Sequence, residues 1–322
     1  MMRLWAVIGR HKAGHILIVF ACVQVGCVIA ALLFPVDFAY LSTTNIQTML
    51  KSIPLLAILA SGVGLLMISG EFDLSVGSNF ALTAYIAALS FNSGVPVVLA
   101  ALLAVAVGVL IGFTNALVVL RAKIPSFIAT LGALMFWRGI LLIISGGQTE
   151  PFRPGRLFEA VFAGSFGPIQ AQFVWAVAAA AHIFLERHKI GNHMFAVGGN
   201  KQSAIAIGVN ANAVKTIGFL VVGALAALAG IISSVRVNSV SADQGKGLEL
   251  QAVAACVIGG LSLMGGEGSI LGIFLGAALL FTIQDVLLLL RAPGFYLEMF
   301  MGILIVLAVI VNGLTKKKED RE

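Results

Sequence analysis

Ten long apolar stretches constrain the fold of this chain more than any other feature of its sequence. Hydrophobic residues make up 60% of its 322 positions and charged residues only 11%, against roughly 25% in an ordinary soluble domain. A helix that crosses about 30 Å of hydrocarbon at 1.5 Å per residue needs about 20 apolar residues. We therefore expect an all-α membrane protein in which residues 1–322 form a single transmembrane domain. The ten expected spans are 14–34, 46–69, 75–92, 95–119, 126–144, 170–186, 214–234, 248–263, 268–290 and 295–313.

Lysine and arginine residues concentrate in alternate loops between these stretches. Cytoplasmic loops of membrane proteins carry the excess of these residues. If both termini are cytoplasmic, 13 of the 20 lie on that side. The same distribution explains the formal net charge of +6, so we expect no nucleic-acid partner. The cytoplasmic set is Arg3, Arg10, Lys12, Arg121, Lys123, Arg187, Lys189, Lys201, Lys215, Lys316, Lys317, Lys318 and Arg321.

Two segments of nearly equal length, residues 46–145 and 214–313, flank the sixth expected span. Each segment holds four spans. Because five spans separate corresponding positions, the two segments enter the membrane from opposite sides. This arrangement is typical of the inverted repeats of transporters. We therefore expect two inverted repeats around a central span.

Motifs for enzymatic chemistry are missing from the sequence. It contains no HExxH, GxSxG or CxxC motif, and its Gly245-Lys246 pair is followed by glycine rather than by Ser or Thr, so a P-loop is also missing. The three cysteines lie in apolar stretches, and the five histidines have no spacing typical of metal ligands. We expect no catalytic residue, no bound metal or cofactor, and no ATP hydrolysis by this chain alone.

The segment GEFDLSVGS, residues 70–78, interrupts the apolar pattern between two spans. Asp73 or Ser75 is well placed to cap the following helix, where a carboxylate suits the positive end of the helix dipole. The alternative is a role in transport. Irregular backbone at membrane depth survives only beside protein or a water-filled cavity, so Glu71, Asp73, Ser75 and Gly77 are candidates to line or gate a pathway.

Arg138 lies within the fifth expected span, towards its outer half. A charged residue inside a span is costly and usually faces a partner or a cavity. Asp285 and Glu298 lie at a similar depth in spans nine and ten. We predict that Arg138 pairs with one of these carboxylates near the outer mouth, and the alternative is that its side chain simply reaches the membrane interface.

The segment GGLSLMGGEGSILGIFLGA, residues 259–277, is rich in glycine. Gly268, Gly272 and Gly276 form two overlapping GxxxG steps, which predict close helix packing. Packing faces of this kind also allow helices to slide during transport. The candidate pathway or gating residues here are Gly260, Ser262, Gly265 and Gly266.

Four motifs in order, GEFDLSVGS, IPSFIATLGALMFWRG, FAVGGN with the following A and GV, and GGLSLMGGEGS, resemble the permease subunits of ribose-type ABC sugar importers. The resemblance covers roughly residues 40–313. Two departures are Glu71-Phe72, where the family more commonly has Gly-Ile, and Glu267 in the glycine-rich segment. The resemblance implies a type II importer-like permease of the bacterial plasma (inner) membrane, working by alternating access. An ion-coupled secondary transporter is the less favoured alternative.

In the family that this chain resembles, a short cytoplasmic helix between spans six and seven docks on the ATP-binding subunit. Residues 187–213 hold the corresponding loop. An ordinary solvated loop is the alternative interpretation. The residues that the resemblance assigns to coupling are Gly198, Gly199, Asn200, Ala204, Ile205 and Gly208.

The same resemblance implies the partners of this chain. They are an ATP-binding cassette subunit, which would use ATP and Mg²⁺, a periplasmic sugar-binding protein, and a second permease copy or paralogue, all set in membrane lipid. On the outer side, Arg153 and Arg156 are expected to contact acidic residues of the binding protein, because charges at an interface rim steer docking. The substrate stays open among ribose, other pentoses, galactose-like hexoses, inositols and furanosyl signalling molecules.

Overall fold

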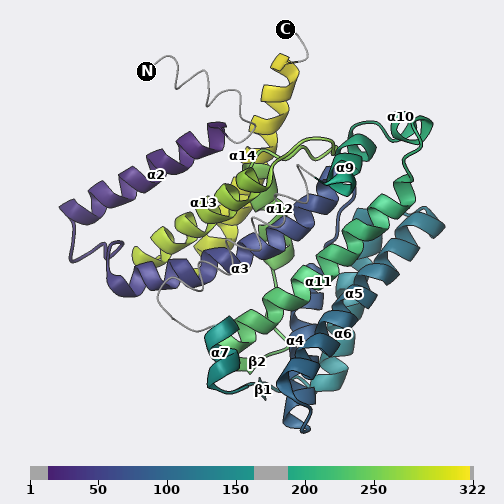
Figure 1. Cartoon of the computed structure of the whole chain (residues 1–322). Helices are drawn as coiled ribbons and strands as arrows, with labels where there is room; N and C mark the ends of the chain where they lie inside the picture. Colours follow the sequence, from purple (N-terminus) through teal and green to yellow (C-terminus); the bar gives the residue numbers. More distant parts are fainter. Residues whose placement is uncertain (1–13, 163–187, 320–322) are drawn as a thin grey trace.

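The computed structural model describes residues 14–162 and 188–319, and in these ranges the regular secondary structure is helical apart from one two-stranded ribbon (Figure 1). The expected sixth span, residues 170–186, lies outside the described residues, as do both chain termini. The elements are α2 (Gly14–Leu33), α3 (Thr43–Ile68), α4 (Val76–Asn92), α5 (Val97–Ala122), α6 (Ser126–Ser145), β1 (Glu150–Pro151), α7 (Arg156–Phe162), α9 (Lys189–Gly199), α10 (Lys201–Ala206), α11 (Ala211–Val237), β2 (Ser239–Val240), α12 (Leu248–Ile258), α13 (Ile270–Leu289) and α14 (Gly294–Glu319).

Six of the described helices are long and apolar enough to cross a membrane. They contain 20 to 27 residues, which at 1.5 Å per residue gives about 30–40 Å. The expectation of an all-helical membrane protein is therefore confirmed. The six helices are α2, α3, α5, α6, α11 and α13.

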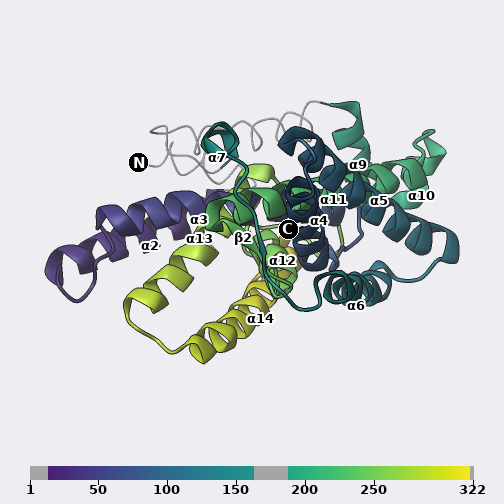
Figure 2. The same ribbon diagram turned by 90° about the horizontal axis from the view of Figure 1, so that it is seen from below.

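Two of these helices, α3 and α11, form the centre of the bundle. In its most apolar window α3 is 72% buried, whereas α2 and α6 are each only 11% buried and lie on opposite sides of the molecule (Figure 2). Glycines bring α11 and α5 together, because a Cβ added at Gly108 or Gly112 would lie within 3.0 Å of α11 atoms. Small residues at a helix interface allow this close approach of two backbones.

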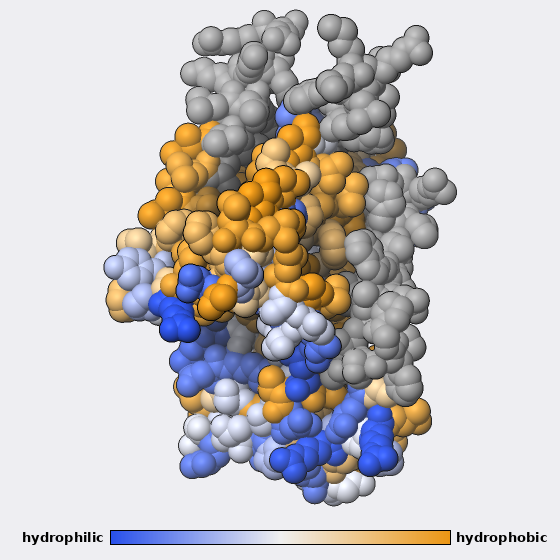
Figure 3. All heavy atoms as spheres, turned by 90° about the vertical axis from the view of Figure 1, so that its left-hand side faces the viewer, coloured by the Kyte–Doolittle hydropathy of each residue, from blue (hydrophilic) through white to orange (hydrophobic). Residues whose placement is uncertain are grey.

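The peripheral helices present apolar side chains to their surroundings. Leu99, Leu103 and Phe113 of α5 and Phe127 and Met135 of α6 are all exposed. In Figure 3 a band of hydrophobic residues crosses the face on the α2 side, and hydrophilic residues gather below it. An apolar surface of this extent is typical of contact with lipid rather than with water.

The glycine steps predicted between residues 268 and 276 give the close packing that was expected. A Cβ added at Gly272 would overlap the carbonyl oxygen of Gly259, and one at Gly276 would overlap that of Ala255. Helices α12 and α13 therefore touch through their backbones. Gly268 does not take part in this helix contact, since α13 begins at Ile270.

The expected eighth span, residues 248–263, is not a complete helical span. Helix α12 ends at Ile258 and contains 11 residues, which is about 16 Å and only half of a hydrocarbon core. Glycines explain both limits. Gly245 and Gly247 precede the helix and Gly260 follows it, all with positive φ angles that other residues rarely adopt. The backbone between β2 and α12 is therefore irregular, and the helix begins only at Leu248.

A short ribbon closes the end of the bundle that is opposite α9 and α10 (Figure 1). Strand β1 pairs with β2 in an antiparallel register that places Glu150 opposite Val240. The side chain of Asn92, at the end of α4, donates hydrogen bonds to the Glu150 carboxylate and to the carbonyl of Pro151. The ribbon thus ties the loop after α6 to the loop after α11.

Candidate functional site

Three motif segments that lie far apart in the sequence meet at one end of the bundle. The backbone N–H of Gly266 donates to the carbonyl oxygen of Ile68 at 2.9 Å. A Cβ added at Gly198 would overlap that same oxygen and would lie 2.6 Å from the nitrogen of Gly266. The end of α3, the end of α9 and the loop between α12 and α13 are therefore in direct backbone contact. We call this contact, made by Ile68, Gly198 and Gly266, the glycine junction.

The α12–α13 loop is shaped for this contact by residues that the sequence singled out. Gly265 has a φ angle of +83°, and its added Cβ would lie 3.0 Å from the backbone of Gly70. Ser262 closes the loop by accepting a hydrogen bond from the N–H of Met264 on its hydroxyl. Gly260 has a φ angle of +86° where the chain leaves α12. These residues position the glycine junction, and their predicted role in gating stays a prediction.

Helices α9 and α10 follow each other through one residue, Asn200. Its N–H donates to the carbonyl of Ala196, and its side-chain oxygen accepts from the N–H of Ser203 at 3.0 Å, so it ends one helix and caps the next. Ala204 of α10 is buried, whereas Ile205 and Ile207 are 52% and 76% exposed. Helix α10 therefore turns one side into the protein and offers apolar side chains on another.

Two of the predicted coupling residues are turned toward the bundle: Gly198 contacts backbone of α3 and of the α12–α13 loop, and Ala204 is buried. Their role in coupling stays a prediction. Ile207 and Met264, which were not predicted, are 76% and 81% exposed. Their signal in the sequence was an apolar residue inside a polar, glycine-containing loop.

The segment between α3 and α4 runs alongside α6 and is hydrogen-bonded to it. The N–H groups of Phe72 and Leu74 donate to the hydroxyls of Ser126 and Thr130, and the Ser78 hydroxyl donates to the carbonyl of Leu134. The eight steps from residue 126 to residue 134 correspond to a rise of about 12 Å along a helix. Helix α4 therefore begins deep inside the bundle, with its irregular approach covered by protein.

Asp73 accepts hydrogen bonds that fix the conformation of this buried segment before α4. Its Oδ1 accepts from both the N–H and the hydroxyl of Ser75, at 2.8 and 2.6 Å, and its Oδ2 accepts from the side-chain nitrogen of Asn115. Ser75 occupies the N-cap position of α4 but makes no capping hydrogen bond with its own side chain. Both side chains are buried, so they are packed within protein in this conformation. A place beside the transport pathway stays a prediction for them.

The N-terminal ends of α4 and α12 meet inside the bundle. A Cβ added at Gly77 would overlap the carboxylate of Glu249 and would lie 2.6 Å from the carbonyl oxygen of Gly245. The Oε1 atom of Glu249 accepts from the N–H of Gly247. Its Oε2 atom is buried with no hydrogen-bond partner among the described residues.

The side chain of Arg138, on α6, donates hydrogen bonds to both of the segments that meet here. Its guanidinium donates to the carbonyl oxygens of Gly77 and Gln244 at 3.0 and 2.9 Å, and also to that of Ala242. The carbonyl of Gly77 belongs to the first turn of α4, whereas those of Ala242 and Gln244 belong to the irregular backbone before α12. A planar guanidinium with five N–H donors suits several carbonyl oxygens at once. One side chain thus bridges the first turn of α4 and the segment that leads into α12.

The predicted ion pair of Arg138 with Asp285 or Glu298 is wrong. Asp285 accepts instead from the side-chain nitrogen of Asn45 at 2.8 Å, and Glu298 is exposed on α14. The prediction assumed complete helices at equal depth, whereas the irregular segment before α12 places carbonyl oxygens within reach of Arg138. The carboxylates close enough to act on Arg138 electrostatically are Glu249 and Asp243.

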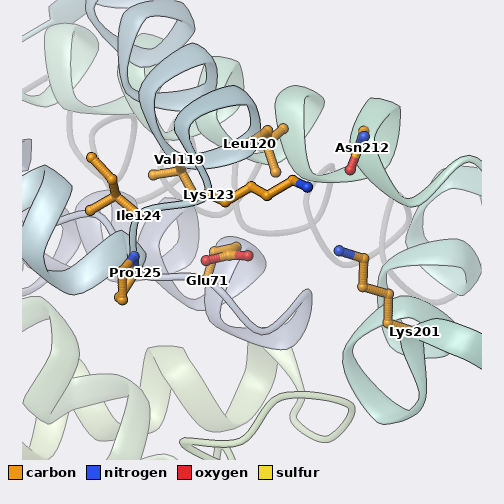
Figure 4. Close-up of a pocket in the computed structure, with 8 residues that line it drawn as sticks. All are labelled: Glu71, Val119, Leu120, Lys123, Ile124, Pro125, Lys201 and Asn212. Atoms are coloured by element: carbon orange, nitrogen blue, oxygen red, sulfur yellow. The ribbon is translucent and has the colours of Figure 1, made fainter.

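A buried ion pair lies beside the glycine junction. Lys215 Nζ and Glu71 Oε1 are 2.6 Å apart, with side-chain exposures of 9% and 15%. Glu71 also borders a cleft of about 460 Å³ between the α5–α6 turn and α10. Figure 4 shows Lys123 and Lys201 extending into this cleft from its two sides. Among the described residues, no group of His, Cys, Asp and Glu side chains is placed to hold a metal ion.

A family described as "Branched-chain amino acid transport system / permease component" matches residues 45–309. The chain belongs to this permease family. The permease is similar to the "Autoinducer 2 import system permease protein LsrC" of Yersinia pseudotuberculosis serotype O:3, with 35% identity over 90% of this chain and 83% of the relative. The protein of the same description from Yersinia enterocolitica serotype O:8 is 34% identical over 90% of this chain and 81% of the relative. No solved structure matches the permease significantly.

These matches confirm the resemblance that the four motifs predicted. The permease is a transport component with several apolar membrane helices, and it belongs with the permeases of sugar-type ABC importers. The glycine junction and the Arg138 contact both lie within the matched range.

Proposed function

We propose that this permease forms the membrane pathway of an ATP-driven importer for a sugar-like molecule, and that its substrate is a furanosyl signalling molecule of the autoinducer 2 type. The observation that carries this proposal is the identity of 35% over 90% of the chain to an autoinducer 2 import permease. A separate subunit hydrolyses ATP, because this sequence has no P-loop. A binding protein outside the membrane delivers the substrate.

The finer architecture of the proposal is ten spans in two inverted repeats. Helices α3 and α11 begin at residues 43 and 211, and α6 and α14 begin at 126 and 294, so both pairs are 168 residues apart. In each half an irregular segment precedes a helix that starts inside the bundle, α4 or α12. Discontinuous helices at the contact between repeats are typical of transport pathways. In this proposal both termini are cytoplasmic, on the same side of the membrane as α9 and α10.

In the proposed mechanism, α10 couples the permease to the ATP-binding subunit. Ile205 and Ile207 dock in that subunit, while Ala204 anchors α10 to the bundle. ATP binding draws the two ATP-binding subunits together and moves α10 in each of two permeases. The permeases, two copies or two related chains in lipid, then rock between outward-open and inward-open states.

Reconstitution tests the function directly. The permease is purified from its native host with the proteins that co-elute, inserted into liposomes, and assayed for uptake of labelled autoinducer 2, ribose, galactose and inositol. We expect uptake that requires ATP and the binding protein, is unaffected by ionophores, and is fastest for autoinducer 2. Uptake without ATP that ionophores abolish would contradict the proposal and indicate an ion-coupled transporter.

The coupling surface is tested by replacing Ile205 and Ile207 together with glutamate. Burying a charge where an apolar side chain docked is strongly unfavourable, so we expect the ATP-binding subunit to stop co-purifying and uptake to fall at least tenfold. The matched control is Gln202→Glu, which adds a charge at an exposed polar position of the same helix. Co-purification that survives the double replacement would show that α10 does not dock there.

The outer arginines are tested by replacing Arg153 and Arg156 with glutamate. Both are exposed beside the β1–β2 ribbon. We expect the stimulation of ATP hydrolysis by the binding protein to weaken about tenfold and to lose its dependence on salt, because rim charges act mainly on the association rate. Arg291→Glu, at an exposed arginine after α13, is the control. An unchanged salt dependence would rule out a docking role for the pair.

A further inference from the structure

The buried Glu71–Lys215 ion pair connects the two parts of the permease that have to move together. Lys215 lies in the second turn of α11, directly after α10 in the chain, and Glu71 lies in the segment that leads into α4. We infer that this pair transmits the displacement of α10 to the buried start of α4, which makes Glu71 and Lys215 positioning residues of the transport cycle. The inference rests on the proposed function.

The connection from α10 to Lys215 is rigid. After α10 the N–H groups of Gly208 and Val209 donate back to the carbonyls of Ile205 and Ala204, so the connector is bonded to the helix that it follows. Asn210 then caps α11, accepting from the N–H of Ala213 at 3.0 Å. A movement of α10 therefore carries the first turns of α11 with it.

The connection from Glu71 to α4 is equally direct. The N–H of Glu71 donates to the carbonyl of Leu66 at the end of α3, and the next N–H, of Phe72, donates to Ser126 on α6. Two residues later Leu74 is bonded to Thr130, and α4 begins at Val76. A displacement of the Glu71 carboxylate thus acts on a short segment with few degrees of freedom. Its far end is the contact of Gly77 with Glu249.

The location of the pair separates it from an ordinary surface salt bridge. Exposed pairs are screened by water and contribute little, whereas both of these side chains are largely buried and 2.6 Å apart. Glu71 also lines the cleft between the α5–α6 turn and α10 (Figure 4). Lys123 borders the same cleft and forms no ion pair among the described residues. It is therefore a matched control for a positive charge at this site.

The test measures substrate moved per ATP hydrolysed by the complete importer in liposomes, together with the amount of assembled complex. The variants are Glu71→Gln, Lys215→Gln and the double variant, with Lys215→Arg and Lys123→Gln as controls. We expect each single variant and the double variant to lower substrate moved per ATP about tenfold, to the same extent, while ATP hydrolysis persists. Two residues that act as one contact give non-additive effects. Lys215→Arg and Lys123→Gln are expected to stay within about twofold of the natural protein.

Several results would overturn the inference. They are an unchanged ratio in the single variants, losses that multiply to about a hundredfold in the double variant, or an equal loss in Lys123→Gln. A loss of assembled complex in the single variants that the neutral double variant restores, with a normal ratio, would show a purely structural pair and would also overturn it. ATP-dependent uptake by the natural protein is measured first, so failure of the proposed function is distinguished from failure of this inference.

Discussion

Replacing Gly198 with alanine is expected to lower transport by this permease at least tenfold. The added Cβ would overlap the carbonyl oxygen of Ile68 and crowd the nitrogen of Gly266, and both are backbone atoms that cannot rotate away. The hydrogen bond from Gly266 to Ile68 would break or lengthen as the segments separate. Overpacking of this kind costs about 1–3 kcal/mol, and here it acts on the contact of α9 with the end of α3 and with the α12–α13 loop.

The measurements for Gly198→Ala are ATP-dependent uptake and the thermal stability of the purified protein in detergent. We expect uptake to fall at least tenfold and the unfolding midpoint to drop by several degrees. Gly199→Ala is the matched control, because its added Cβ would meet only the Cα of Gly266 at 3.9 Å, an ordinary contact. Equal behaviour of the two variants would contradict the glycine junction as described.

Replacing Arg138 with methionine is expected to have the second largest effect. Methionine fills similar space but leaves the carbonyl oxygens of Gly77, Ala242 and Gln244 without their donor. Each buried acceptor left unsatisfied costs about 1–3 kcal/mol, so the first turn of α4 and the segment before α12 should separate. We expect a large fall in thermal stability and loss of uptake.

Arg138→Lys distinguishes the two interpretations of this residue. If the side chain only reached the membrane interface, lysine would serve equally well and the variant would match the natural protein. If it bridges carbonyl oxygens of two segments, the single ammonium cannot reproduce the forked geometry, and we expect an intermediate stability. Arg121→Met, at an exposed arginine on the last turn of α5, is the control and should be neutral.

Local composition was sufficient to predict the helices of this protein but not how each one begins. The boundaries of α2, α5 and α6 agree with the apolar stretches to within a few residues, because in lipid every backbone group of a span has to be satisfied within its own helix. The stretch at 248–263 misled the prediction at its end, since Gly259 and Gly260 end the helix while the apolar pattern continues beyond them.

The sequence identified several of the candidate residues but not the atoms that they contact. Gly266 and Gly198 stood out as glycines, but the sequence did not show that one backbone touches the other. Arg138 was recognised as a buried charge in need of a partner, yet its partners are carbonyl oxygens, which every residue carries and no pattern marks. The partner of Lys215 was also missed, because 144 positions separate it from Glu71.

The sequence by itself determined that the chain folds in a membrane and to which transporters it is related, since hydropathy and ordered motifs depend only on residues near one another in the chain. The tertiary structure alone decided that α4 and α12 start inside the bundle and that Glu71 pairs with Lys215. It also decided that Arg138 bridges the first turn of α4 and the segment before α12. These contacts depend on the depth and packing of helices from different parts of the chain. Depth and packing are set by the whole bundle, where buried polar groups find whichever partner lies within reach.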